Sequence, residues 1–183
     1  RLVGSEMCIR DSNMTQKNIS IKPFSDEFSS IKLLDFKQNI DERGYLVKPF
    51  LKETFSQYDS DFDEIYFSES KKNVIRGIHF QKSPKELKKV VVCIKGEVKD
   101  IFIDMRKNSE SYLKFSSTKL KQNKGIYIPH GFGHGFSVLS DSAIILYLQS
   151  GSFDANLELG INPLSLELDW EVDSPILSSK DSN

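Results

Sequence analysis

The chain has few cysteines and almost no net charge, and both shortages exclude classes of protein. Only Cys8 and Cys93 occur among 183 residues, so we expect no disulfide framework and a reducing compartment, the cytoplasm. Lysine and arginine total 25 against 26 aspartate and glutamate residues. This balance gives no electrostatic reason to expect a nucleic-acid partner. Any ligand must therefore be recognised by local groups.

Long apolar runs are also missing. No run approaches the roughly 20 residues that cross a bilayer, and the first residues lack the basic and apolar regions of a signal peptide. We therefore expect neither a membrane span nor a membrane partner.

The first segment, residues 1–13, continues into no periodic pattern, and we expect it to lie outside the fold. Its text, RLVGSEMCIRDS, resembles translated sequencing-adapter read-through, which would make Met14 the native start. An ordinary disordered tail is the alternative. Since 38% of the residues are hydrophobic and 28% are charged, a single globular domain is expected over residues 14–183.

Short β-rich runs dominate the chain from residue 31 onward, and turn-forming residues separate them. Strands are expected at residues 31–36, 45–50, 65–70, 74–81, 88–95, 98–105, 115–120, 125–128, 135–139 and 144–149. Only residues 51–58 and a turn near the C-terminus look helical, and the part from residue 154 has the mixed pattern of a wrapping tail. The pattern predicts an all-β barrel or sandwich with short peripheral helices.

Strand parity gives the first functional indication, because alternate residues of a strand point to the same face. His79 shares a face with Gln81, Tyr147 shares one with Gln149, and Lys89 shares one with apolar neighbours. Polar groups that recur among apolar strands suit a small barrel whose interior holds a ligand. An outward solvated face is an equal alternative.

The three histidines are His79, His130 and His134. A histidine on an apolar strand such as NVIRGIHFQ is more often a core residue than a catalytic one. The glycines around His134 favour a bend that faces a ligand, although structural turns need them too. His130 is expected to be exposed.

A metal centre is the competing interpretation, because histidines on neighbouring strands hold metals in many β-barrels. Such sites usually have a second histidine two residues after the first, and here that position is Gln81. Glutamine is a poor ligand beside histidine or carboxylate, so we expect no metal site.

Five blocks follow one another in order: NVIRGIHFQ, KKVVVCIKGEVKDIFIDMRK, IYIPHGFGHGF, LSDSAIILY and DSPILSSKD. Together they resemble the dTDP-4-dehydrorhamnose 3,5-epimerase family over residues 41–181. The resemblance implies a cupin fold, a double-stranded β-helix jelly-roll barrel, in a homodimer that needs no metal and no cofactor. It also implies an isomerase that epimerises C3, C5 or both of a nucleotide-diphosphate 4-keto-6-deoxy sugar, in dTDP-rhamnose or related polysaccharide biosynthesis.

The same resemblance assigns roles to individual residues. His79 matches the general base, Tyr147 the acid on the opposite side of the sugar, and Lys89 the lysine beside the 4-keto oxygen. Asp181 matches the aspartate that orients the histidine, although it lies in a terminal segment where fraying is common. The substrate contacts are matched by Arg43, Arg76, Gln81, His134, Glu158 and Lys180.

This set makes chemical sense for proton transfer next to a ketone. A cation at the carbonyl stabilises the enolate oxygen, histidine has a suitable pKa for a base, and a carboxylate on the far nitrogen fixes the tautomer. Guanidinium groups match diphosphate oxygens in fork geometry. Arg76 and His79 have opposite parity, so both reach one site only if Gly77 marks a bulge.

Each of these roles has a structural alternative. Lys89 beside another lysine could lie on a solvated edge, Tyr147 could be a core aromatic residue, and Arg43 could simply pair with Asp41. The alternative functions are a nucleotide-sugar 3,4-ketoisomerase and a non-catalytic sugar-binding cupin.

Departures from the family pattern bear on the substrate. Where thymidine-specific members carry Gln-x-Asn, this chain has Glu64 and Tyr66, and Lys48 stands where a glutamate is expected. The nucleotide, the sugar and the number of inverted centres therefore stay open.

Overall fold

The computed structural model describes residues 18–58 and 61–182. The expected tail over residues 1–13, with Cys8, and the expected start at Met14 lie outside these residues. The strands are β1 (Ile19–Pro23), β2 (Lys32–Phe36), β3 (Asn39–Asp41), β4 (Gly44–Leu46), β5 (Glu64–Lys71), β6 (Ile75–Gln81), β7 (Lys89–Lys95), β8 (Glu97–Asp104), β9 (Phe115–Lys121), β10 (Lys124–Ile128), β11 (Phe132–Val138), β12 (Ser142–Gln149) and β13 (Glu158–Gly160). The helical segments are α1 (Lys52–Phe55), η1 (Ser56–Tyr58) and η2 (Pro163–Ser165).

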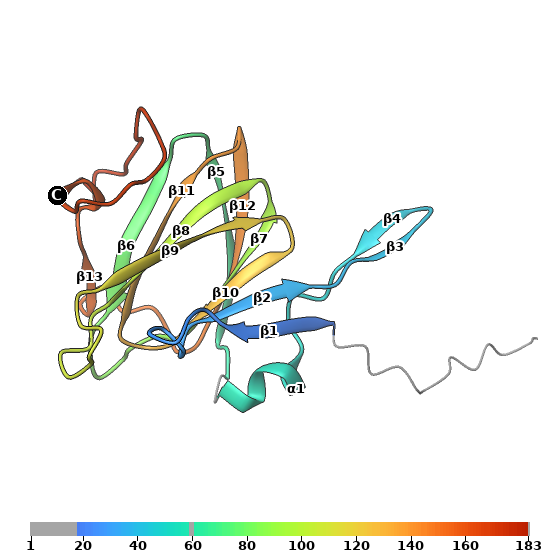
Figure 1. Cartoon of the computed structure of the whole chain (residues 1–183), viewed down its shortest axis with the longest axis horizontal. Coiled ribbons are helices and arrows are strands. Elements are labelled where there is room, and N and C mark those ends of the chain that lie inside the picture. Colours follow the sequence, from blue (N-terminus) through green and yellow to red (C-terminus); the bar gives the residue numbers. More distant parts are fainter. Residues whose placement is uncertain (1–17, 59–60, 183) are drawn as a thin grey trace, which may run out of the picture.

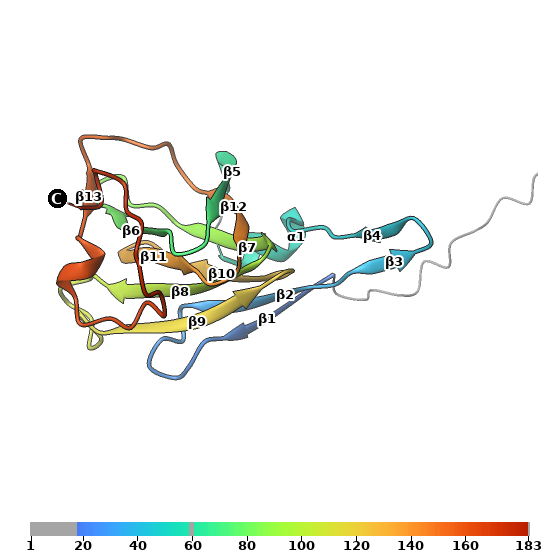
Figure 2. The ribbon, with the colours of Figure 1, turned by 90° about the horizontal axis from the view of Figure 1, so that it is seen from above.

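Two antiparallel sheets face each other (Figures 1 and 2). One has the strand order β1-β2-β10-β7-β12-β5, and the other has the order β13-β6-β11-β8-β9. The short hairpin β3-β4 projects away from both. The expected all-β architecture is confirmed, with sheets packed face to face as in a β-sandwich or jelly roll.

Most expected strands appear near their predicted bounds, but the prediction for residues 45–50 was wrong beyond Leu46. The helix expected over residues 51–58 appears as α1 followed by η1. Strands β1, β3 and β13 were not predicted. β3 and β13 have three residues each and β1 has five, and each pairs with a neighbouring strand, a condition that local propensity does not report.

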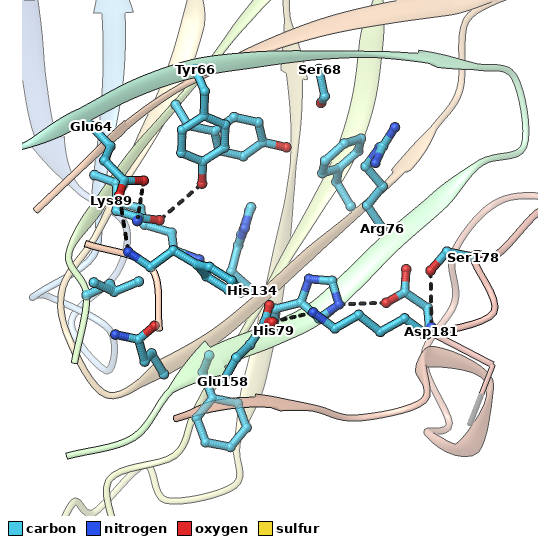
Figure 3. A pocket seen from close by; sticks show the side chains of 18 residues that line it. Glu64, Tyr66, Ser68, Arg76, His79, Lys89, His134, Glu158, Ser178 and Asp181 are labelled. Atoms are coloured by element: carbon cyan, nitrogen blue, oxygen red, sulfur yellow. Dashed lines mark hydrogen bonds and ion pairs between the residues drawn. The ribbon is translucent and has the colours of Figure 1, made fainter. Parts of the chain in front are cut away.

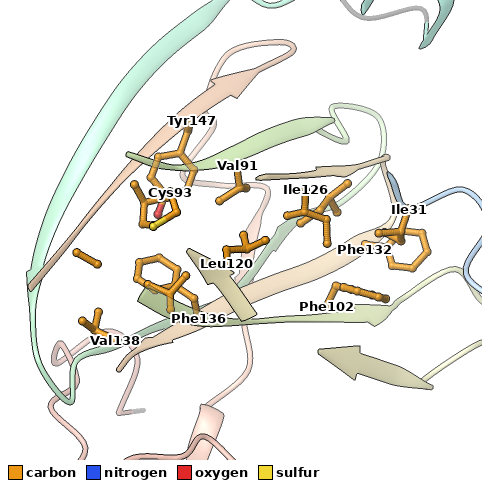
Figure 4. Close-up of a cluster of buried hydrophobic side chains, with 14 of the residues drawn as sticks. Ile31, Val91, Cys93, Phe102, Leu120, Ile126, Phe132, Phe136, Val138 and Tyr147 are labelled. Atoms are coloured by element: carbon orange, nitrogen blue, oxygen red, sulfur yellow. The ribbon is translucent and has the colours of Figure 1, made fainter. Parts of the chain in front are cut away.

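The interior lies between the sheets. Side chains of β7, β10 and β12 meet those of β8, β9 and β11 there, with Phe102, Phe136, Leu120, Ile126 and Ile145 among the fully buried ones (Figure 4). Burial of this apolar surface supplies the main driving force for closing the sandwich.

Both sheets also have covered outer faces. Phe55 of α1 packs with Val90, Val92 and Leu148 on the outside of the first sheet. Trp170 covers the outside of the second sheet with other residues of the C-terminal segment. Burial on both faces explains why several strands show continuous apolar runs instead of clean alternation.

The C-terminal segment is tied to the second sheet at several points, as expected for a wrapping tail. Lys99 of β8 forms ion pairs with Asp169 and Glu171, and Ser137 donates a hydrogen bond to the carbonyl of Trp170 at 2.5 Å. Farther along, the backbone N–H and C=O of Ile176 form hydrogen bonds with the residues just before and just after Val74, so Ile176 pairs with Val74 as in a parallel bridge. The tail therefore returns along β6.

No helix in the described part of the chain is long and apolar enough to cross a membrane.

Candidate active site

A cavity of about 570 Å³ opens between the two sheets (Figure 3). Its walls are formed by β5, β7 and β12 from the first sheet, by β6, β11 and β13 from the second, and by the end of the tail. The lining residues are Glu64, Tyr66, Ser68, Arg76, His79, Phe80, Gln81, Leu87, Lys89, His134, Phe136, Tyr147, Gln149, Phe153, Glu158, Ser178, Lys180 and Asp181. Every residue predicted for the site except Arg43 is among them.

The bulge required to bring Arg76 and His79 to one site is present. His79 pairs with His134 across β6 and β11, whereas Arg76 pairs with Phe136, so β6 contains one extra residue. Gly77 lies at this point with φ of +96°. A Cβ on Gly77 would lie 2.5 Å from the carbonyl oxygen of His134, so only glycine fits this position.

His79 is paired with the last described part of the tail. Its Nε2 atom lies 2.6 Å from Oδ1 of Asp181. The Asp181 side chain is 5% exposed, whereas 28% of the His79 side chain remains accessible from the cavity. The carboxylate is positioned to fix the imidazole tautomer while the other ring nitrogen stays available.

Tyr147 and Lys89 stand on the sheet opposite His79. Burial raises the pKa of Tyr147 above that of an ordinary tyrosine, which keeps the hydroxyl protonated as a potential proton donor. Burial lowers the pKa of Lys89, while nearby Glu158 acts in the opposite direction. Within the described residues, the ammonium group of Lys89 forms no ion pair, so it is available for an oxygen atom of a ligand.

Gln81 lines the cavity, but its amide group is already engaged. Its nitrogen donates a hydrogen bond to the carbonyl of Lys85 at 2.5 Å, and its oxygen accepts one from the backbone of Asp154 at 2.9 Å. Gln81 therefore joins two segments at the rim of the cavity.

His134 belongs to a second histidine–aspartate pair. Its Nε2 atom lies 2.8 Å from Oδ2 of Asp100, whose side chain is fully buried. Burial raises the pKa of Asp100, and the neighbouring His134 opposes this shift. Asp100 was not among the residues predicted for the site, although its parity with Val98 and Phe102 on β8 places it on the interior face.

Strand β5 contributes three lining residues that were not among those predicted for the site, Glu64, Tyr66 and Ser68. Their spacing of two residues along β5 was the available signal. Gln149 connects them to β12, because it accepts a hydrogen bond from the Tyr66 hydroxyl at 3.1 Å and donates one to Glu64 at 3.3 Å.

The rim of the cavity carries opposite charges. Lys180 of the tail forms an ion pair with Glu158 of β13, and its ammonium nitrogen lies 5.9 Å from the centre of the Phe153 ring. Both charged side chains predicted for this region thus lie at the cavity, and they partner each other.

Arg43 is the predicted site residue that the structure leaves outside the cavity of its own chain. It lies between β3 and β4 on the projecting hairpin, where its guanidinium contacts Asp41 at 2.6 Å and its side chain is 85% exposed. This contact lowers the pKa of the Asp41 carboxyl. His130 is exposed, as expected.

Within the described residues, no three His, Cys, Asp or Glu side chains gather in a way that could hold a metal ion. The grouped side chains are instead an imidazole–carboxylate pair on one wall and a phenol with an ammonium group on the other. Such a set can remove a proton from a bound molecule on one side and return one on the other.

Residues 26–183 match the family model described as dTDP-4-dehydrorhamnose 3,5-epimerase. The Shigella flexneri enzyme of that name is 34% identical over 86% of this chain and 91% of its own length. The Bacillus anthracis enzyme, solved with TDP and pyrophosphate bound, superposes with a TM-score of 0.80 at 30% identity and covers 89% of this chain and 97% of that one.

A Legionella pneumophila 3,5-epimerase, solved in complex with dTDP-4-keto-L-rhamnose, gives a TM-score of 0.83 at 30% identity and covers 90% of both chains. These likenesses confirm the expected cupin jelly-roll fold.

Proposed function

The chain belongs to the dTDP-4-dehydrorhamnose 3,5-epimerase family and is a sugar epimerase, and we propose that it inverts C3, C5 or both in a nucleoside-diphosphate-linked 4-keto-6-deoxy sugar. The observation that carries this proposal is that His79, on one sheet and paired with Asp181 of the tail, faces Tyr147 on the other sheet across a single cavity. A hexose ring between them would have one face toward each group.

In the proposed reaction, His79 removes the proton from a carbon next to the ketone. The electrons move to the carbonyl oxygen, and the ammonium group of Lys89 stabilises the resulting enolate. Tyr147 then donates its proton to the same carbon from the opposite face, which inverts the centre. Asp181 stabilises the imidazolium that forms on His79.

The remaining residues are proposed to hold the substrate. Arg76, which donates a hydrogen bond to Ser70 at 2.8 Å, presents its guanidinium at the cavity. His134, Glu158 and Lys180 are proposed as polar contacts around the sugar and the diphosphate. Gln81 is proposed to support the site indirectly, because its amide group holds together two segments at the rim of the cavity.

We also propose a homodimer in which the β3-β4 hairpin contacts the second copy. Ile40, Tyr45 and Leu46 of this hairpin are largely exposed, at 74%, 54% and 54%. Apolar side chains grouped on a projecting hairpin favour a protein partner. A second copy would also give Arg43 a route to a phosphate group, because Arg43 lies outside the cavity of its own chain.

The reaction is proposed to need no metal, since the residue two positions after His79 is a glutamine whose amide is already bonded. It would take place in the cytoplasm, where nucleotide sugars are made. Activity that survives a chelator would support a reaction without metal, and loss of activity that returns with added metal would contradict it.

The test is to incubate the purified protein with dTDP-, GDP- and CDP-linked 4-keto sugars in deuterated water. We expect deuterium at C3, C5 or both of one substrate, together with inverted product, and neither with His79→Ala. Migration of the carbonyl between C3 and C4 would instead indicate a ketoisomerase. Binding without deuterium uptake in any substrate would indicate a sugar-binding protein.

A further inference from the structure

Strands β5 and β12 present two register pairs of residues to the cavity. Glu64 is the register partner of Gln149, and Tyr66 is the register partner of Tyr147. Strand β5 is the last strand of its sheet. Tyr66 therefore lies on the edge strand, directly beside Tyr147.

The two tyrosine rings are stacked. Their centres are 4.8 Å apart and their planes differ by 16°. Tyr147 is 8% exposed, whereas Tyr66 is 40% exposed, so Tyr66 covers the face of Tyr147 that would otherwise meet solvent. The geometry is within the range of favourable aromatic pairs.

Tyr66 is itself held in place. Its hydroxyl donates a hydrogen bond to Gln149, and Gln149 in turn donates one to Glu64. Burial and the nearby charges of Glu64 and Glu158 raise the pKa of Tyr66 to about 12, so the hydroxyl stays protonated and the bond persists. The ring of Tyr66 is thus a fixed surface.

The hydroxyl of Tyr147 is held less firmly. Ser68 lies beside it and lowers its pKa, but the buried Oγ atom of Ser68 makes no hydrogen bond of good geometry in the described part of the chain. The orientation of the Tyr147 ring therefore depends on packing. A proton donor must come within about 2.6–3.2 Å of its target, and a small rotation of the ring would move the phenol oxygen out of that range.

We propose that Tyr66 is a positioning residue, which holds the phenol of Tyr147 at the site of reprotonation by stacking on its ring. This inference rests on the proposed function.

The test compares Tyr66→Ala, Tyr66→Leu and Tyr66→Phe in deuterated water, and measures both deuterium uptake and inverted product. With Tyr66→Ala and Tyr66→Leu, the ratio of inversion to uptake should fall about tenfold, while the uptake that depends on His79 stays within about threefold of the wild type. Tyr66→Phe keeps the stacking ring and loses only the hydrogen bond to Gln149, so its ratio should stay within about threefold of the wild type.

Tyr112→Ala is the matched control. Tyr112 is 38% exposed and lies outside the cavity, so its loss should leave the ratio unchanged. A general loss of structure would lower uptake and inversion together, and would be seen as a lower unfolding temperature. If Tyr66→Ala does not fold, comparison of Tyr66→Leu with Tyr66→Phe still distinguishes the effect of the aromatic ring from the effect of side-chain volume.

Two results would overturn the proposal: an unchanged ratio in Tyr66→Ala and Tyr66→Leu, or a fall in Tyr66→Phe as large as in Tyr66→Ala, which would assign the effect to the hydroxyl. If the wild-type protein neither exchanges nor inverts any 4-keto sugar, the proposed function itself fails. A wild-type protein that works, with insensitive Tyr66 variants, refutes only this inference.

Discussion

Asp181 lies 2.6 Å from His79, although 102 positions separate them in the sequence. The contact depends on the C-terminal segment, which Trp170 anchors on the outside of the second sheet and which then pairs with β6 through Ile176. The proposed base is thus complete only when the tail is folded.

Replacement of that carboxylate is therefore a direct test of the pair. With Asp181→Asn, we expect kcat to fall by about two to four orders of magnitude, because the imidazolium loses its counter-charge and the tautomer is no longer fixed. KM should change much less. Steady-state kinetics on the substrate identified in the panel would measure both.

Asp173→Asn is the control for that variant, because Asp173 is an exposed carboxylate on the same tail and lies outside the cavity. Equal kcat values for Asp181→Asn and Asp173→Asn would remove Asp181 from the mechanism.

Tyr147→Phe should separate the two halves of the reaction. The variant keeps the ring that stacks on Tyr66 but loses the donor, so deuterium should still enter the substrate while inverted product falls at least about 100-fold. Mass spectrometry and stereochemical analysis of the product would follow the two events. A loss of deuterium uptake as severe as that of His79→Ala would contradict this division of roles.

The loss of activity at high pH should report the deprotonation of Lys89. The reaction needs the ammonium form of Lys89 and the phenol form of Tyr147, and both forms are lost as the pH rises. Burial lowers the pKa of Lys89 and raises that of Tyr147, so Lys89 should lose its proton first.

We therefore expect kcat/KM to decline below the ordinary lysine pKa of about 10.4. Lys89→Arg, which keeps its charge, should move this decline to higher pH even if the overall rate is lower. A decline at the same pH in both proteins would mean that another group is responsible.

Gly77→Ala should disrupt both stability and the site. The new Cβ would lie 2.5 Å from the His134 carbonyl oxygen at a backbone φ of +96°, and we expect a loss of about 1–3 kcal/mol in the free energy of unfolding. Gly44→Ala is the matched control, because Gly44 also has a positive φ but has nothing within 4 Å of the added atom.

Denaturant unfolding would measure the stability of both variants. A loss no larger for Gly77→Ala than for Gly44→Ala would show that the close approach at the bulge is not what requires glycine.

The local pattern of the sequence was sufficient for the sandwich and for much of the cavity wall. Alternation along single strands placed His79 with Gln81 and Tyr147 with Gln149, because side-chain direction in a strand is fixed by the pleat. The same rule showed that Arg76 and His79 would point to opposite faces of a regular strand, and the bulge at Gly77 brings both to one site.

Other features were beyond the reach of local pattern. The short strands β1, β3 and β13 form only because a neighbour pairs with them. In the sequence, Asp100 is a single polar residue in an apolar strand. Only the pairing of β11 with β8 brings His134 beside it. The stack of Tyr66 on Tyr147 needs the register of β5 against β12.

By itself, the sequence determined which side chains share a face of each strand and, through the order of its blocks, the family. The tertiary structure decided which faces meet: it brought Asp181 onto His79, placed Tyr147 opposite them, and left Arg43 on a hairpin outside the cavity. The physical reason is that strand alternation depends on backbone geometry over a few residues. Contacts between distant segments depend instead on register and on the path of the chain, which only the packing of the whole core fixes.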